Sequence, residues 1–214
     1  MRTQKRSSGE QMANKKCRLL CILVLCCALV LAACGSETAD ENTLTFRKDG
    51  KVRGHSVTDF PEETYNAVQL ENEIEEAIAQ YNADAGEKRI KLLACRVAAG
   101  KATCTLQYES VQDYADFNLV TIMSGLLTDM VRRGEIDPEV ELLTPDMKYA
   151  TTPETILAAD ENPDDLTVLV LEEAVRVDSF RKPVYMSRNV TQDETGIVRT
   201  SPDGGLAYIV YGKA

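Results

Sequence analysis

Residues 89–108 read RIKLLACRVAAGKATCTLQY, and their alternation predicts an antiparallel β-hairpin. The turn falls at Ala98–Lys101, with a two-residue loop of Ala99 and Gly100. Pairing the two strands around this loop places their alternating apolar side chains on one face (Leu93, Cys95, Val97, Ala102, Cys104 and Leu106). A slip of one residue would send one strand's set to the opposite face. The pattern therefore predicts both the register of the hairpin and a single buried face.

Two cysteines face each other in this register. Cys95 and Cys104 form a non-hydrogen-bonded pair, for which about 4.5 Å is expected between Cα atoms, at the short end of the disulfide range. Two interpretations stay open: a disulfide, which an extracytoplasmic location would permit, and two thiols buried in a core. The mature chain has no C-x-x-C spacing typical of redox catalysts, so either form is structural.

The N-terminus carries the features of an export signal. Three basic residues, Lys15, Lys16 and Arg18, precede the apolar run Leu19–Ala33, which has 15 residues. As a helix this run would span about 22 Å, short of the ~30 Å hydrocarbon core of a bilayer. A signal peptide therefore fits better than a transmembrane helix.

The end of this run resembles the bacterial lipobox, in which a Leu and two small residues precede an invariant Cys. The sequence Leu31-Ala32-Ala33-Cys34 matches all four positions. The resemblance implies cleavage before Cys34 and a diacylglyceryl thioether on its sulfur, an anchor with two acyl chains that binds membranes stably. The expected location is the outer face of the bacterial cytoplasmic membrane.

Three segments are predicted on this basis: a signal peptide over residues 1–33, the lipidated cysteine with a flexible linker over 34–42, and an extracytoplasmic domain over 43–214. The linker residues Gly35–Asn42 read GSETADEN, which is small, polar and acidic. Eight residues reach at most about 27 Å when extended, so the domain is expected close to the membrane surface.

The pattern of the mature chain predicts an α+β fold with a largely antiparallel sheet and two main helices. A hairpin is expected over Thr43–Thr58, and a helix from Asp59 as N-cap to about Asn82. Further elements are expected as a short helix (Ser110–Phe117), a strand (Asn118–Met123), a helix opened by Ser124 and ended by Gly134, a short helix (Glu154–Ala158), and strands at Val140–Leu143, Leu166–Leu171, Ala174–Val177, Pro183–Ser187, Ile197–Thr200 and Leu206–Tyr211. Residues 201–205 read as the turn of a last hairpin.

Catalytic and metal signatures are weak. The single imidazole is His55, and Ile122–Leu126 lacks the glycines of a nucleophile elbow, so Ser124 is interpreted as a helix cap. Asp160, Asn162 and Asp164 match the first ligands of a calcium loop, but the later positions fail. The sequence supports no cofactor or metal site. Its many carboxylates leave open a glycosidase-type pair, although Trp is absent.

Charge separates the signal from the domain. The chain has 24 basic and 34 acidic residues, and six of the bases with one acid precede Cys34, which leaves 18 bases and 33 acids, a net charge of −15. Such a balance argues against nucleic-acid binding. Such a domain is expected to be repelled by an anionic lipid surface, so the lipid anchor is expected to hold it at the membrane.

The layout resembles uncharacterised small lipoproteins of clostridia-type Gram-positive bacteria. The resemblance rests on the lipobox, the Thr43–Thr58 hairpin, the Gly100–Ala102 turn, Tyr114–Asn118 (YADFN) and the strand Ala207–Tyr211. It implies no activity and no site residue except Cys34. The leading hypothesis is a non-enzymatic domain that binds an envelope protein or a wall component. The alternatives are a small-ligand binder that serves a transporter or sensor, and a carboxylate-dependent envelope hydrolase.

Overall fold

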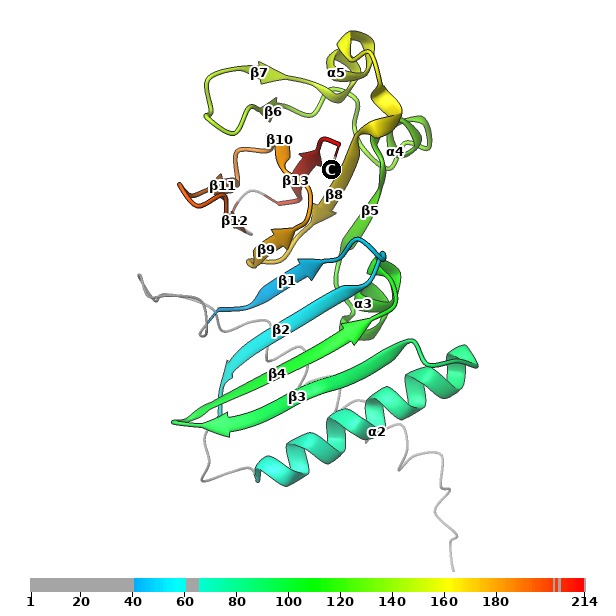
Figure 1. Ribbon diagram of the computed structural model, residues 1–214, viewed down its shortest axis with the longest axis vertical. Helices are drawn as coiled ribbons and strands as arrows, with labels where there is room; N and C mark the ends of the chain where they lie inside the picture. The colour runs from blue at the N-terminus through cyan, green and yellow to red at the C-terminus, as the bar shows by residue number, and fades with distance from the viewer. Residues whose placement is uncertain (1–40, 61–65, 202, 204, 214) are drawn as a thin grey trace, which may run out of the picture.

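The computed structural model describes residues 41–60, 66–201, 203 and 205–213 of the 214-residue chain. Cys34, the expected signal peptide and most of the linker lie outside these residues. Within them, the chain forms the predicted α+β fold, with two mostly antiparallel sheets placed one above the other in Figure 1.

The first sheet has seven strands among the described residues, in the order β11-β12-β9-β1-β2-β4-β3. Its strands are β1 (Thr43–Phe46), β2 (Val52–Asp59), β3 (Ile90–Ala98), β4 (Lys101–Tyr108), β9 (Arg176–Ser179), β11 (Val190–Gln192) and β12 (Val198–Thr200). Only β1 and β9 run parallel among these neighbours. This parallel pair joins the N-terminal strands β1–β4 to the C-terminal strands β9, β11 and β12 in one sheet.

The second sheet has six described strands in the order β5-β8-β13-β10-β6-β7. They are β5 (Ile122–Leu126), β6 (Leu142–Leu143), β7 (Ala150–Thr151), β8 (Thr167–Leu171), β10 (Pro183–Met186) and β13 (Ala207–Tyr211). The segment at 201–205 does not close a hairpin as expected, because β12 joins the first sheet and β13 pairs with β8 and β10 in the second. Local turn residues do not reveal such a change of sheet.

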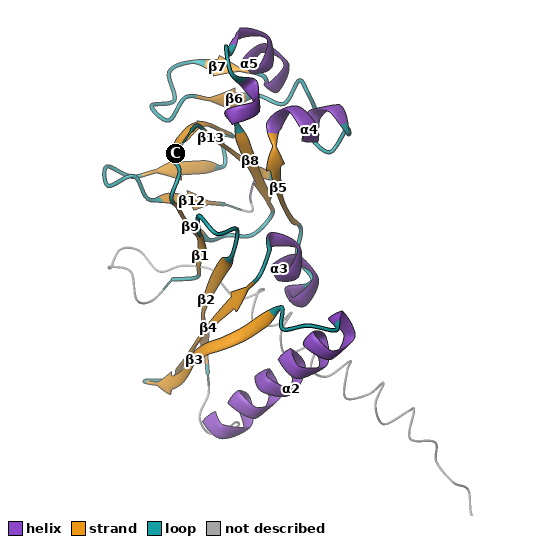
Figure 2. Cartoon of the chain, turned by 45° about the vertical axis from the view of Figure 1, so that its right-hand side comes forward, coloured by secondary structure: helices purple, strands orange, loops and turns teal. Residues whose placement is uncertain are grey.

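The helices are α2 (Ala67–Ala85), α3 (Val111–Asn118), α4 (Leu127–Arg132) and α5 (Pro153–Ala159), with a 3₁₀ turn, η1, at Pro163–Asp165. Helices α2 and α3 lie on one side of the seven-stranded sheet (Figures 1 and 2). Ile78 of α2 and Tyr114 of α3 enter the core that covers this side. None of the described helices lies on the opposite side of strands β1, β2, β4 and β3.

The predicted hairpin register is confirmed at its tip. Val97 pairs with Ala102 and Cys95 with Cys104, and Ala99 and Gly100 adopt φ angles of 53° and 73° in the two-residue loop. The prediction was wrong at the far end, where β3 contains a β-bulge and Leu92 rather than Leu93 pairs with Leu106. Leu93 is 38 % exposed. The extra residue shifts the alternation of β3, so that Leu92, which precedes the bulge, faces the core.

Two predicted helix starts are also corrected. Asp59 is the last residue of β2 and pairs with Lys101, while the cap of α2 is Asn66, whose side chain accepts a hydrogen bond from the Val68 amide at 2.9 Å. Ser124 does not cap α4 but lies within β5, opposite Leu169 of β8. In both cases pairing with a distant strand outweighs the local capping signal.

Two hydrophobic clusters form the core. One lies between the seven-stranded sheet, α2, α3 and the inner face of the second sheet, and the other lies between the second sheet, α4 and α5. The buried members of both clusters fall between Leu44 and Tyr211. A chain that begins after Cys34 therefore retains the whole of this core.

Candidate partner-binding groove

The predicted disulfide residues lie opposite each other on the β3–β4 hairpin. The Sγ atoms of Cys95 and Cys104 are 2.6 Å apart, on neighbouring strands of the hairpin. Cys104 is buried and Cys95 is half-buried against the core. The pair is therefore placed to hold β3 against β4.

The residues weighed for catalysis and metal binding do not converge. His55 lies on β2, where its Nδ1 is 2.9 Å from Thr105 Oγ1, whereas Ser124 lies on the other sheet. Asp160 accepts a hydrogen bond from the Asn162 amide at 2.8 Å in an exposed turn. Within the described part of the chain, no group of three His, Cys, Asp or Glu residues is placed to hold a metal ion.

The carboxylates with raised pKa values are not arranged as an acid–base pair. Glu173 accepts hydrogen bonds from the Tyr114 hydroxyl at 3.0 and 3.2 Å, and burial raises its pKa. The pKa of Glu139 is raised because its side chain shares a hydrogen bond with Glu154, and both side chains are exposed. Neither arrangement sets two carboxyls across a groove.

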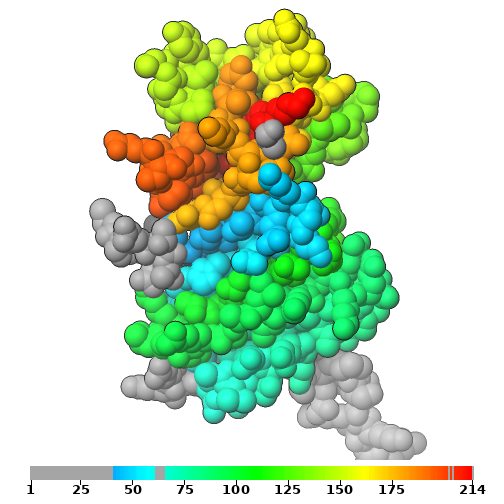
Figure 3. Space-filling model, in the orientation of Figure 1, coloured from blue at the N-terminus to red at the C-terminus, as the bar shows by residue number. Residues whose placement is uncertain are grey.

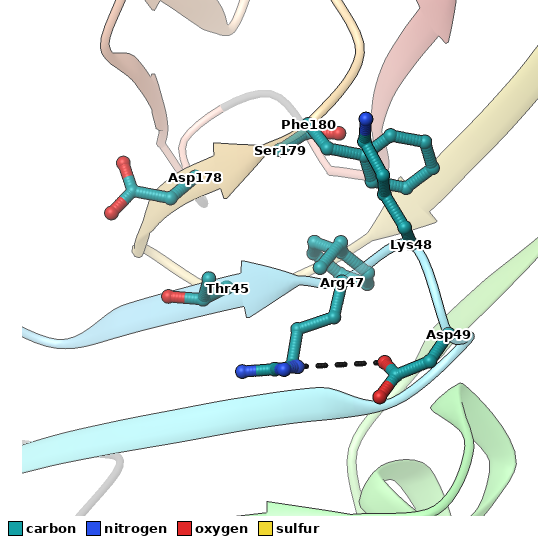
Figure 4. Close-up of a pocket in the computed structure, with 8 residues that line it drawn as sticks. Thr45, Arg47, Lys48, Asp49, Asp178, Ser179 and Phe180 are labelled. Carbon is teal, nitrogen blue, oxygen red and sulfur yellow. Dashed lines mark ion pairs between the residues drawn. The ribbon is translucent and has the colours of Figure 1, made fainter. Parts of the chain in front are cut away.

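Figure 4 shows a shallow pocket of about 520 Å³ where the ends of β1 and β9 meet the β1–β2 turn. Arg47 and Asp49 form an ion pair across it, with 3.4 Å between Nε and Oδ1. Asp178, at its other side, is paired with Arg176 at 3.0 Å. Both carboxylates of this pocket, Asp49 and Asp178, are therefore engaged in ion pairs.

The edges of the two sheets differ in how they are protected from pairing with another chain. Strands β11 and β7 are only three and two residues long. The nine-residue strand β3 carries exposed Lys91 and Arg96 and contains the bulge at Leu93. Short length, charge and bulges are the usual means by which proteins block an edge.

Strand β5 has none of these protections. Its sequence IMSGL contains no charge and no proline, and its pairing with β8 runs without a bulge. Two backbone hydrogen bonds flank the pairing of β5 with β8: Thr121 O accepts from the Glu172 amide, and the Leu127 amide donates to Leu166 O. Because backbone groups alternate in direction along an antiparallel strand, those of the odd-numbered residues Met123 and Gly125 also face β8. The amides and carbonyls of Ile122 and Ser124 consequently point away from the sheet. No described residue forms a backbone hydrogen bond with them.

A groove of about 960 Å³ runs along this free edge, between α3 and α4. In Figure 1 the edge of β5 opens to the right, with α4 above it and α3 below. The apolar part of its lining includes Leu119, which is 59 % exposed, and Met123, Val120 and Met130. The polar side chains of the lining are held by hydrogen bonds. Gln112 donates to Asp116 at 2.7 Å, and Arg133 donates to both carboxylate oxygens of Glu135 at 2.8 Å.

Buried contacts fix the two walls of the groove. Ser110 caps α3 and donates to buried Asp113 at 2.6 Å, which also accepts from the Tyr81 hydroxyl at 3.2 Å. On the other wall Gly125 lies against Met130, so closely that a Cβ at this position would be 3.2 Å from the Met130 sulfur. A groove with fixed walls is suited to binding because little order has to be created when a ligand enters.

Tyr114, the first residue of the YADFN stretch, connects α3 to both sheets. Its ring meets that of Tyr108 edge-on at 5.1 Å, and its hydroxyl reaches Glu173 after β8. Gly54 of β2 makes room for both rings, since a Cβ there would lie 3.3 Å from each. Asn118 donates to the Tyr108 hydroxyl at 3.2 Å and completes the cluster.

The sequence did not point to this groove. The strand was expected to end at Met123, and its edge position depends on the order of strands in the sheet, which no local pattern carries. The available signal was an uncharged run of nine residues, Leu119–Leu127, in a highly charged chain. Within the described residues, no helix combines the length and apolar character needed to span a bilayer. Comparisons of the chain with protein-family models, with curated proteins and with solved structures find no match.

Proposed function

We propose that the protein is a lipid-anchored, non-enzymatic binding domain on the outer face of the bacterial cytoplasmic membrane, and that it binds an extended segment of an envelope protein along β5. The observation that carries the proposal is the unprotected edge of β5, with the outward amides and carbonyls of Ile122 and Ser124. A peptide added as a strand would satisfy these groups, and the groove between α3 and α4 would receive its side chains.

Binding by strand addition suits a partner whose sequence is read loosely. The main-chain hydrogen bonds supply affinity, and side-chain pockets supply specificity at alternate positions. Here the groove offers apolar contacts at Leu119, Val120 and Met123, with charge at its rim from Arg133 and Glu135. The expected ligand is therefore an extended peptide with alternating apolar residues.

The test places a photo-crosslinking residue at Ser124 in the full lipidated chain and identifies the crosslinked segment by mass spectrometry. The same residue at Ala94, exposed on the protected edge strand β3, is the matched control. A synthetic peptide of the crosslinked segment should then bind the purified domain. It should slow hydrogen exchange at the Ile122 and Ser124 amides.

Two substitutions separate strand addition from a general loss of structure. Ser124→Pro removes an outward amide and should lower peptide affinity at least tenfold, whereas Ser124→Ala should leave it unchanged. Equal crosslinking from Ser124 and Ala94, a crosslink to a second copy of this chain, or peptide binding without protection of these amides would each overturn the proposal.

The anchor is tested separately. Cys34→Ala should abolish labelling by a fatty-acid analogue and release the protein from the membrane fraction, whereas Cys27→Ala, in the expected signal peptide, should change neither. Retention of the label in the Cys34 variant would refute lipidation at this residue.

A further inference from the structure

Within the described part of the chain, no helix covers the side of the seven-stranded sheet that faces away from α2 and α3. Figure 3 shows β1, β2, β4 and β3 crossing the middle of this face as blue to green bands, with no helix over them. The register places alternate residues of three strands on it: Arg53, His55, Val57 and Asp59 of β2, Lys101, Thr103, Thr105 and Gln107 of β4, and Lys91, Ala94, Arg96 and Ala98 of β3. This set is called the open face.

The open face is basic although the domain is acidic. It contains four bases and one acid, Asp59, and residues 88–108 as a whole hold five bases and no acid. No described carboxylate forms an ion pair with Arg53, Lys91 or Arg96, and Arg53 Nε is buried without a hydrogen-bond partner. The acids gather in two other places: residues 135–165 hold ten acids and one base, and α2, on the opposite side of the same sheet, holds five acids and no base. Residues 135–165 include β6, β7 and α5, at the opposite end of the molecule from β3 in Figure 1.

The chain enters the fold at this same face. Glu41 forms ion pairs with Arg176 at 3.6 Å and Arg199 at 3.1 Å. The register Arg199–Arg176–Thr43–His55 puts these arginines on the face that carries His55. Six residues separate Glu41 from Cys34, a reach of at most about 24 Å. An anchor at Cys34 would therefore hold the open face within reach of the bilayer.

We propose that the open face binds the anionic headgroups of the membrane in which the chain is anchored. This rests on the lipid anchor of the proposed function, and it revises the expectation that net charge keeps the domain away from lipid. Screening limits electrostatic action to about 8 Å at physiological ionic strength. The acids of α2 lie across the sheet and those of residues 135–165 at the far end of the molecule, so neither group cancels the bases of the open face. Each base near an anionic surface strengthens binding about fivefold, by about 1 kcal/mol. The acidic end then points away from the surface.

The test uses a chain that begins at Gly35, which lacks the anchor but retains the core, and vesicles of phosphatidylcholine with or without phosphatidylglycerol. The protein should sediment with the anionic vesicles and not with the neutral ones. Raising the salt from about 0.1 M to about 0.5 M should release it. Lys91→Gln with Arg96→Gln should weaken binding at least tenfold, whereas Lys148→Gln with Lys182→Gln, an equal loss of charge at exposed sites elsewhere, should leave it unchanged.

Three results would overturn the proposal: equal sedimentation with both vesicles, equal effects of the two double variants, and binding to soluble polyphosphate without binding to anionic vesicles. Because the assay contains neither the acyl chains nor a peptide, such a failure is separate from a failure of the β5 groove or of the anchor.

Discussion

Two edge strands of the molecule, β3 and β5, meet solvent in opposite ways. Strand β3 carries Lys91 and Arg96 and is bent by a bulge, so another strand cannot align with it easily. Strand β5 is shorter and uncharged, and it leaves the backbone groups of Ile122 and Ser124 without partners in the described chain. This fold therefore protects one edge and leaves the other open, within a groove that limits access to it.

The two strands also differ in what lies behind them. The outer face of β3 belongs to the basic open face, whereas β5 packs on β8, whose last four residues are buried. The side chains of these four β8 residues are buried and cannot contact a partner, so a partner has to bind the second sheet at its edge strand, β5. The first sheet can instead use a face. The two proposals above follow from this division.

The largest effect is expected from moving a proline by one position along β5. Met123→Pro removes an amide that donates to β8, and the lost ladder hydrogen bond should cost about 3 kcal/mol, the upper end for a buried acceptor left unpaired. Ser124→Pro removes an outward amide and should cost less than half as much. Urea denaturation followed by circular dichroism measures both. Equal losses of stability would show that Ser124 also turns its amide toward the sheet and would remove the basis for strand addition.

The next effect concerns how β3 is held. We expect Cys95 and Cys104 to oxidise to a disulfide in the exported protein, because their Sγ atoms are already in contact across the hairpin. Loss of two thiol hydrogens should lower the mass by about 2 Da, and the closed loop should raise the free energy of unfolding by about 2–3 kcal/mol. Thiol alkylation and urea midpoints with and without reductant measure these changes.

The matched control is Cys95→Ala with Cys104→Ala, whose stability should not respond to reductant. Free thiols in protein isolated from the cell envelope under alkylating conditions would support the other interpretation, two thiols in the core. In that case β3 would be held by main-chain pairing and by α2 alone.

A smaller effect tests the bulge that distinguishes β3 from β5. Leu92 packs against the core and Leu93 is displaced by the bulge. Leu92→Ala should cost about 2 kcal/mol, at the low end for a leucine in a core, whereas Leu93→Ala should cost less than about 1 kcal/mol. Thermal denaturation of the two variants gives the order. The reverse order would show that Leu93 packs in the core, as simple alternation predicts, and that β3 lacks the bulge that helps protect its edge.

The same strands show which features a sequence reveals. The hairpin tip was predictable because its register follows from neighbouring residues of alternating character on both sides of one turn. The bulge was not, because choosing between Leu92 and Leu93 depends on the shape of a core built by distant segments. The open edge of β5 and the location of Ser124 depend on β8, more than forty residues away. Basic residues in β3 were visible, but their gathering on one face required the register with β2.

The smallest effect concerns the wall of the β5 groove. Glu173 holds α3 through Tyr114, and burial raises the pKa of Glu173 above its ordinary value of about 4.3. Between the unfolded and folded pKa values the folded protein binds more protons, so the free energy of unfolding falls as the pH rises through that window. Tyr108, which is also buried here, stays protonated throughout because burial raises its own pKa.

Glu173→Gln keeps an oxygen that can accept from Tyr114 but cannot ionise, so this fall should be missing from its profile. Relative to the variant, the wild type should lose stability as the pH rises above about 4, and the difference should become constant above the folded pKa. Urea midpoints between about pH 4 and pH 8 measure it. If the wild type instead gains stability with rising pH, the carboxylate is favoured in the fold, and Tyr114 holds α3 by a charged rather than a neutral hydrogen bond. The wall of the β5 groove would then be most secure at neutral pH, whereas burial of Glu173 predicts that it loosens there.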